Sequence, residues 1–304
     1  MKQLIRITVG LTISCLIAAF VMGAVFTQTD KAKKRNQHTN IQNTMIALLG
    51  YSKSNPSPSD LKLNNIYRYI VEDGKNKYLG YMLPVDKGGK TGYEFLLIDL
   101  DGKYVARYKV KISPEKAIEA PDREEALKGV LKPAMTFSYA DSTVVVNLGG
   151  KRLAYLLPGE FPGFKTFVSV MLALDPSFKI LGLEIMENEE DPGLGGEIVQ
   201  EYFKNQFRDK ELKKVKELKV VKKPLPEEYK NYLETKKREK GAFSKEEIDE
   251  IRSKYKEKDI YALTGATISS RAVTKGVKGM VKKFAYRIKI LDGVIEGQGI
   301  PSAF

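Results

Sequence analysis

The sequence predicts an α+β fold, in which a transmembrane helix at the N-terminus precedes a domain of antiparallel β-hairpins with flanking helices. Three observations predict this class. The first apolar run is long enough to cross a bilayer, four pairs of β-rich runs meet at turn signals, and the last long segment repeats its apolar residues at helical spacing. With 304 residues, of which 42% are hydrophobic, the chain can bury a sizeable core in one or two domains.

The N-terminal run LIRITVGLTISCLIAAFVMGAVF has about 20 apolar residues, enough for one membrane-spanning helix. A cleaved signal peptide is the alternative. Its apolar core has only about 7–15 residues, so an uncleaved anchor over residues 1–27 is favoured. Basic residues flank the run on both sides and are more numerous after it. By the positive-inside rule alone, the body of the protein would lie in the cytoplasm.

The composition restricts the chemistry. A formal net charge of +13 and a pI near 9.4 suggest a nucleic acid or an anionic membrane as partner. However, the lysines between Lys204 and Lys258 alternate with glutamates and lack aromatic residues spaced to stack bases, so we expect no nucleic acid. Cys15 and His38 are the only residues of their types. This excludes intrachain disulfides, CxxC redox chemistry, c-type haem attachment, cysteine-ligated iron–sulfur clusters, histidine metal sites and Ser-His-Asp triads, and we expect no metal.

The segment after the anchor is a polar stalk followed by a Pro/Ser-rich linker, over residues 28–65. Residues 66–135 form an N-terminal hairpin region, with turns at Asp73-Gly74 and Asp101-Gly102 between aromatic-rich runs. The stretch SPEKAIEAPDREEALKGVLK at its end is predicted to be mostly helical.

Residues 136–304 form the second region, whose hairpins turn at Gly149-Gly150 and at Asp175-Pro176-Ser177. Farther on, Ser244 and Glu247 have the spacing of a capping box and predict a helix start.

The two hairpin regions are interpreted as an internal duplication in which the first copy is degenerate. Two hairpin pairs that merely share turn chemistry are the alternative. Aligned at a constant offset, the matching residues are Lys77, Leu79, Tyr81, Leu83, Pro84, Gly89, Leu100 and Asp101 in the first region, and Lys151, Leu153, Tyr155, Leu157, Pro158, Gly163, Leu174 and Asp175 in the second.

The segment YALTGATISS opens the last predicted helix, whose start is expected between Thr267 and Ser270 because apolar residues recur on one face from Val273 onward. A helix start offers free N–H groups and positive potential, which suit a phosphate. Gly265 and Ala266 leave room for its approach. An ordinary threonine or serine N-cap is the alternative.

A second loop, DPGLGGE, has glycines flanking Leu194, so that backbone can approach a flat ring while one apolar side chain packs on it. The two motifs together predict a nucleotide or flavin cofactor. The absence of GxGxxG after a strand argues against a Rossmann site, and there is no Walker A sequence.

From about Thr136 to Phe284, the chain resembles the FMN-binding G subunit of the Rnf electron-transport complex and its relative, the C subunit of the sodium-translocating NADH:quinone reductase. The resemblance rests on the N-terminal anchor, on the run GFKTFVSVMLALDPSFKILGLEIMENEEDPGLGGEI and on TGATISSRAV. It implies FMN joined through its phosphate to the hydroxyl of Thr267, the last residue of the [S/T]GAT motif. It further implies an electron-relay subunit of an ion-translocating oxidoreductase, with the ferredoxin:NAD (Rnf) type preferred.

The resemblance also implies partners and a location. The partners are the other subunits of a membrane complex, the lipid bilayer and an FMN transferase that attaches the cofactor. The location is the inner, cytoplasmic membrane, with a single span and the C-terminal domain on the extracytoplasmic (periplasmic) side. This side contradicts the charge count, and we follow the family because a large C-terminal domain can translocate despite its charge.

The expected site has no catalytic acid or base and no independent substrate turnover. Residues expected to frame the phosphate beside Thr267 are Thr264, Gly265, Ala266, Ile268 and Ser269, and those expected to line the flavin are Glu190, Asp191, Gly193, Leu194 and Gly195. The chain departs from the family at Tyr261, where an Asp is usual, and at Asn188-Glu189-Glu190-Asp191, where His-x-Glu-Thr is common. The other functions left open are a flavin-free structural subunit, the C subunit of a quinone reductase, and a lipid- or partner-binding module that uses the lysine-rich stretch.

Overall fold

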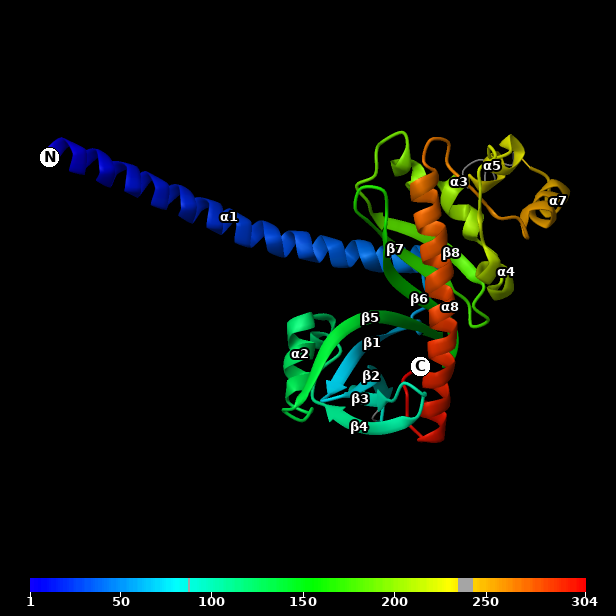
Figure 1. Cartoon of the computed structure of the whole chain (residues 1–304), viewed down its shortest axis with the longest axis horizontal. Coiled ribbons are helices and arrows are strands. Elements are labelled where there is room, and N and C mark those ends of the chain that lie inside the picture. Colours follow the sequence, from blue (N-terminus) through cyan, green and yellow to red (C-terminus); the bar gives the residue numbers. More distant parts are fainter. Residues whose placement is uncertain (87, 235–242) are drawn as a thin grey trace. The chain divides into compact units, whose positions relative to one another are not determined.

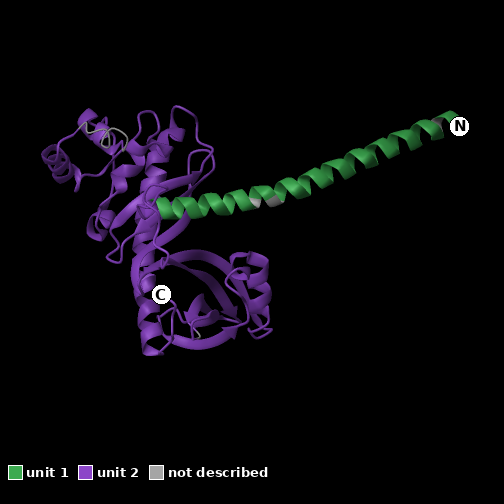
Figure 2. Ribbon diagram, turned by 180° about the vertical axis from the view of Figure 1, so that it is seen from behind, with its two compact units in different colours: residues 1–47 green, residues 48–304 purple. Residues whose placement is uncertain are grey.

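The computed structural model describes residues 1–86, 88–234 and 243–304. They form two compact units, residues 1–47 and 48–304 (Figure 2). The first unit is almost entirely helix α1 (Lys2–Leu48), which continues through the segment expected to be a polar stalk. Among the described residues, α1 is the one helix long and apolar enough to cross a membrane, with a mean hydropathy of 2.3 over an 18-residue window.

The second unit is built on one eight-stranded antiparallel sheet with the strand order β4-β3-β2-β1-β5-β6-β7-β8 (Figure 1). Its α+β class with antiparallel hairpins is therefore as predicted, and each expected turn joins two neighbouring strands. The strands are β1 (Lys62–Asp73), β2 (Asn76–Asp86), β3 (Thr91–Ile98), β4 (Tyr104–Val110), β5 (Met135–Leu148), β6 (Lys151–Pro162), β7 (Phe167–Leu174) and β8 (Ile180–Glu187). Because β1 pairs with β5 along its whole length, the strands of residues 66–135 and 136–304 belong to the same sheet.

The register of β2–β4 recurs in β6–β8. Tyr81 pairs with Leu96 in the first half of the sheet, and Leu157 pairs with Leu172 in the second. When Tyr81 is equated with Leu157, Leu96 coincides with Leu172, and the bulge that interrupts β3 next to Ile98 coincides with the bulge next to Leu174 in β7.

The alignment made from the sequence differs from this structural match, because it equates Tyr81 with Tyr155 instead of Leu157. The two alignments are thus related by a slip of two positions along the strand. Such a slip leaves every side chain on the same face of the sheet, so the apolar pattern cannot distinguish the two alignments.

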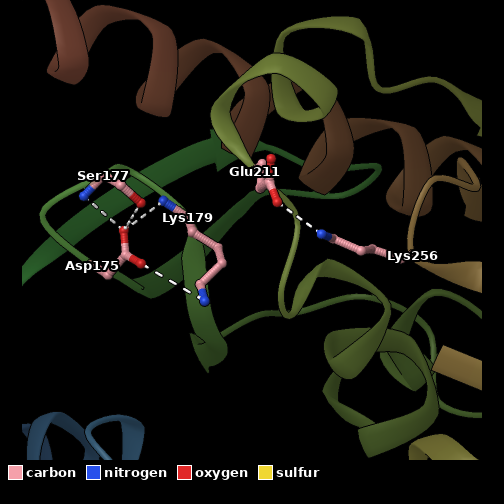
Figure 3. A network of polar contacts seen from close by, with 5 residues as sticks. All are labelled: Asp175, Ser177, Lys179, Glu211 and Lys256. Atoms are coloured by element: carbon pink, nitrogen blue, oxygen red, sulfur yellow. Dashed lines mark hydrogen bonds and ion pairs between the residues drawn. The ribbon is translucent and has the colours of Figure 1, made fainter. Parts of the chain in front are cut away.

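The turns after β3 and β7 repeat the same hydrogen bonds. The Asp99 carboxylate accepts the N–H groups of Asp101 and Lys103, at 3.0 and 2.7 Å. Asp175 does the same with Ser177 and Lys179, at 2.8 and 2.9 Å (Figure 3). Asp175 thus corresponds to Asp99 and not to Asp101, in agreement with the alignment set by the strands.

Helices α8 and α2 pack on opposite faces of the sheet. Helix α8 (Thr267–Gly297) buries the expected apolar face, including Val273, Val277 and Phe284, against one sheet face that carries Leu83 from the first strands and Leu172 from the last. The predicted helical connector forms η1 (Lys116–Ile118) and α2 (Ala120–Lys128), and α2 packs on the opposite face over β1–β4 (Figure 1).

The chain between β8 and α8 forms a group of short elements. They are η2 (Gly195–Val199), α3 (Glu201–Lys204), η3 (Asn205–Phe207), α4 (Leu212–Glu217), β9 (Val220–Val221), α5 (Glu227–Leu233), α7 (Lys245–Tyr255) and β10 (Ile260–Tyr261). The predicted capping box of Ser244 and Glu247 is present at the start of α7. An ion pair of 2.8 Å between Lys256 and Glu211 joins the end of α7 to the start of α4 (Figure 3). Residues 235–242 of the lysine-rich stretch lie outside the described residues.

Candidate functional site

Helix α8 begins at Thr267, within the window that the sequence predicts. Its N-cap is Ala266, and no side chain of the described chain caps the first turn, so the threonines of TGAT do not act as N-caps. Ser270 stabilises the turn instead: its hydroxyl accepts the Leu263 N–H at 3.0 Å and donates to the Ala266 carbonyl at 2.9 Å. The first N–H groups of a helix have no partner inside it, so this start keeps donors available for an anion.

The TGAT turn and the glycine loop meet at Gly265. This glycine has φ +76°, and a Cβ on it would lie 2.8 Å from Cδ2 of Leu194. The backbone conformation favours glycine here, and the short distance shows that the loop approaches this turn closely. The fold thus brings together the two motifs that the sequence singles out, although Leu194 and Gly265 are far apart along the chain.

The glycine loop is held by its own backbone. The carbonyl of Asp191 accepts the N–H groups of Leu194 at 3.1 Å and of Gly196 at 2.9 Å, while Gly193 has φ +75°. This turn leaves 47% of Leu194 exposed, and Ile268 on the first turn of α8 is 57% exposed. Two apolar side chains thus remain open to solvent next to Thr267, which is half-buried.

Glu190, expected to line the flavin, is buried, and its carboxylate binds groups within the protein. Oε1 accepts the N–H groups of Phe164 at 2.7 Å and of Lys165 at 3.3 Å, and Oε2 accepts the hydroxyl hydrogen of Ser269. A Cβ at Gly163 or Gly195 would lie only 2.3 or 2.6 Å from these oxygens. One carboxylate therefore joins the β6–β7 turn, the glycine loop and the start of α8.

The remaining expected site residues divide into accessible and buried groups. Thr264 and Gly265 are exposed, whereas Ala266, Ser269 and Gly195 are buried, and Ser269 uses its hydroxyl on Glu190. Asp191 is half-exposed and its carboxylate forms an ion pair with Lys165.

Sequence reasoning did not assign a role to the β6–β7 turn, which borders the site. Phe164 is 58% exposed, its N–H donates to Glu190, and Lys165 next to it pairs with Asp191 of the glycine loop. The available signal was the run GFKTF, in which Phe164 occupies a hairpin turn where polar residues are usual.

Tyr261 and Asn188, where the chain departs from the pattern of the family that it resembles, both form hydrogen bonds within the protein. Tyr261 lies in β10, where its backbone N–H donates to Gln206 Oε1 at 2.7 Å and its carbonyl accepts from Gln206 Nε2 at 3.2 Å. Asp259, an acidic residue two positions before Tyr261, accepts hydrogen bonds from Lys214 Nζ at 2.8 Å and from the Lys219 N–H at 3.3 Å. Asn188 accepts the backbone N–H of Glu190 at 3.2 Å, so it supports the buried carboxylate.

The residues present fit a flavin mononucleotide. The helix start has free N–H groups and no acidic residue in its first turn, which suits a phosphate, and the Thr267 hydroxyl lies there. Leu194 and Ile268 offer apolar surface for a ring. Among the described residues, no group of three or more His, Cys, Asp or Glu side chains could hold a metal ion.

Comparison with known proteins identifies the same region. Residues 163–282 match the family model described as FMN-binding domain. The match begins in the β6–β7 turn, includes the glycine loop and ends within α8, so it covers every segment of the candidate site. It supports FMN as the cofactor of this region.

The G subunit of the proton-translocating ferredoxin:NAD(+) oxidoreductase complex of Clostridium ljungdahlii is 33% identical over 135 residues, which are 44% of this chain and 55% of that protein. The chain therefore spans about half the length of this curated relative. The resemblance predicted from the sequence is confirmed.

Two solved structures are also similar. NqrC of Shewanella oneidensis has a TM-score of 0.33 and 19% identity, over 48% of this chain and 57% of that chain. The C subunit of the Na(+)-translocating NADH-quinone reductase from Parabacteroides distasonis has a TM-score of 0.33 and 16% identity, over 64% of this chain and 74% of that chain.

Proposed function

We propose that this protein is an electron-relay subunit of a membrane-bound, ion-translocating oxidoreductase of the ferredoxin:NAD type, with FMN joined by a phosphoester to Thr267. The observation that carries the proposal is the position of the Thr267 hydroxyl at an uncapped helix start, next to the exposed side chains of Leu194 and Ile268. The name of the Clostridium relative and the FMN-binding match support the same role.

FMN, when bound, supplies redox chemistry in steps of one or two electrons. The residues of this chain hold it. The start of α8 stabilises each nearby negative charge by about 0.3–1 kcal/mol. The exposed side chains of Leu194 and Ile268 would shield a bound ring from water, and the exposed Thr264 and Gly265 would leave room for the phosphate. No general acid or base is needed, because the protein relays electrons and has no turnover of its own.

The proposal includes a place in the cell. Helix α1 would form the single span in the cytoplasmic membrane, and residues 48–304 would lie on the extracytoplasmic side, where a lost FMN could not be replaced. The other subunits of the complex and an FMN transferase would be its partners. Protease treatment of intact spheroplasts, with a C-terminal epitope tag as reporter, tests the side: a protected tag would place the domain in the cytoplasm.

The first half of the sheet is proposed to be a degenerate copy of the second. The shared register of β2–β4 and β6–β8 and the equivalent Asp99 and Asp175 turns support a duplication. The site belongs to the second copy alone, because the glycine loop and α8 follow β8 and have no counterpart after β4.

The decisive experiment is intact mass and in-gel flavin fluorescence of the denatured protein, co-expressed with an FMN transferase. Wild type is compared with Thr267→Ala and with the matched control Thr264→Ala, which changes the exposed threonine at the other end of the motif. We expect covalent FMN in the wild type and the control and none in Thr267→Ala. An unmodified wild type would favour the flavin-free structural role instead, and a labelled Thr267→Ala would move the attachment to another hydroxyl.

A further inference from the structure

The outward face of α8 carries a continuous row of positive charge. Residues 267–291 contain seven basic residues and no Asp or Glu. Arg271, Lys275 and Lys282 recur at spacings of four and seven, which places them on one side of the helix, opposite the face that packs on the sheet. All three are exposed, and none forms an ion pair within the described part of the chain. We name these three residues the basic stripe.

A second basic segment runs beside the stripe. Helix α4 and strand β9 contact α8, and Lys278 of α8 donates to the Leu218 carbonyl at 3.3 Å. The exposed lysines of this segment are Lys213, Lys216, Lys219, Lys222 and Lys223. The surface next to the stripe is therefore also predominantly positive.

The stripe begins at the candidate site. Arg271 follows Thr267 by one helical turn, so the two lie on the same side of α8, and Ile268 lies next to them. Around this point the exposed apolar side chains are Phe164, Leu194 and Ile268. The stripe then extends about 16 Å along the helix from Arg271 to Lys282.

We propose that the basic stripe, together with the apolar side chains around Thr267, docks an acidic surface of the protein that exchanges electrons with this subunit. The inference rests on the proposed function, since it assigns a partner to the same site. Complementary charge around a small apolar contact raises the association rate and orients the encounter, and electron-transfer contacts need only a small interface.

The geometry favours a protein over a lipid surface as the occupant. A helix that adsorbs to a membrane inserts its apolar face between the headgroups. The apolar face of α8 is already buried against the sheet, with Val273, Val277 and Val281 fully inaccessible. What α8 presents outward is charge, which suits a carboxylate-rich protein surface.

The test uses the full-length protein in nanodiscs of neutral lipid and fluorescently labelled flavodoxin, an acidic redox protein, as the probe. Affinity is measured by fluorescence anisotropy at low and high salt. The stripe variant is Arg271→Glu/Lys275→Glu/Lys282→Glu. The control variant, Lys109→Glu/Lys111→Glu/Lys132→Glu, makes the same change of charge at exposed lysines outside the site.

We expect the stripe variant to weaken flavodoxin binding at low salt by at least about tenfold, and the control to change it by less than about twofold. Equal weakening by both variants would reduce the effect to net charge and overturn the inference, as would unchanged binding by the stripe variant. In a second assay, the protein is floated with phosphatidylglycerol vesicles. If the stripe variant loses this flotation but binds flavodoxin as the wild type does, the face binds lipid and the inference is overturned. The flavin content is read separately from absorbance: a flavin-free protein with stripe-dependent binding would refute the proposed function and leave the docking face standing.

Discussion

Removing the buried carboxylate of Glu190 is the sharpest test of how the site is held. Its two oxygens accept hydrogen bonds from Phe164, Lys165 and Ser269, and the residue is only 6% exposed. Glu190→Ala leaves these three donors without their acceptor, the Ser269 hydroxyl in a buried position and the two N–H groups in a partly buried one. Each unsatisfied buried donor lowers the free energy of unfolding by about 1–3 kcal/mol. We therefore expect Glu190→Ala to lower it by about 3–4 kcal/mol after partial relaxation.

Glu190→Gln separates charge from hydrogen bonding. The amide oxygen can still accept from the Phe164 N–H, and the amide nitrogen can donate to the oxygen of Ser269. Only the charge-assisted part of these hydrogen bonds is lost, so Glu190→Gln should lower the free energy of unfolding by about 1 kcal/mol. The difference between the alanine and glutamine variants therefore measures the free-energy cost of unsatisfied donors.

The assay is urea unfolding of the flavin-free protein in detergent. The chain has no tryptophan, so unfolding is followed by tyrosine fluorescence and circular dichroism. A double-mutant cycle adds Gly195→Ala, whose Cβ would lie 2.6 Å from Oε2 of Glu190. We expect this change to lower the free energy of unfolding by about 2 kcal/mol in the wild type and by less in Glu190→Ala, where only Ser269 Oγ at 2.7 Å and the Cβ of residue 190 at 3.0 Å stay close. Equal costs in the two backgrounds, or equal losses for the alanine and glutamine variants, would refute the reasoning.

Three further outcomes are expected in the same unfolding assay. Gly276→Ala should lower the free energy of unfolding by about 2–3 kcal/mol, because its Cβ would lie 2.2 Å from the Phe161 ring. Gly279→Ala, on the same helix, meets nothing within 4 Å and should raise it by about 0.5–1 kcal/mol. Equal effects of the two variants would contradict this packing. Burial lowers the pKa of Lys210 to about 8. Between about pH 8 and 10 the unfolded state therefore binds more protons than the folded state, and the free energy of unfolding should rise with pH. Lys210→Met should abolish this rise. Burial raises the pKa of Asp141, but its partners Arg68 and Arg287 outweigh this effect and lower the pKa overall. Asp141→Asn should therefore lower the free energy of unfolding at neutral pH. This difference from the wild type should disappear in acid, where Asp141 is protonated.

The sequence was sufficient for the parts of the fold that depend on local signals. The hairpin turns, the capping box at Ser244 and the start of α8 each follow from a few neighbouring residues, and all are present. The sequence also predicted that TGAT and the glycine loop lie together, because each motif on its own suggested a binding site for part of the same cofactor. The register of the two sheet halves did not, because a slip of two positions preserves the apolar pattern.

Side-chain roles at the site were harder to predict, because they depend on contacts between distant segments. The position of Glu190 next to a glycine loop suggests contact with a ligand. Its burial becomes evident only when Gly163, in the β6–β7 turn before it, and Ser269, on α8 far after it, are brought within contact distance. Likewise, Phe164 belongs to the site only because its N–H donates to Glu190 and Lys165 next to it pairs with Asp191.

The site separates a fixed frame from an accessible rim. Glu190, Ser269 and Ser270 are buried, and their hydrogen bonds join three segments, so they fix the position of Thr267 at the start of α8. The rim is different: the ion pair of Lys165 with Asp191 is almost half-exposed and contributes little to stability. The tethered relay that we propose would need this division, because its attachment point must not move while the ring must remain reachable by a partner. Changes in the frame should therefore reduce stability and cofactor attachment together, whereas changes in the rim should alter partner access in a stable, flavin-loaded protein.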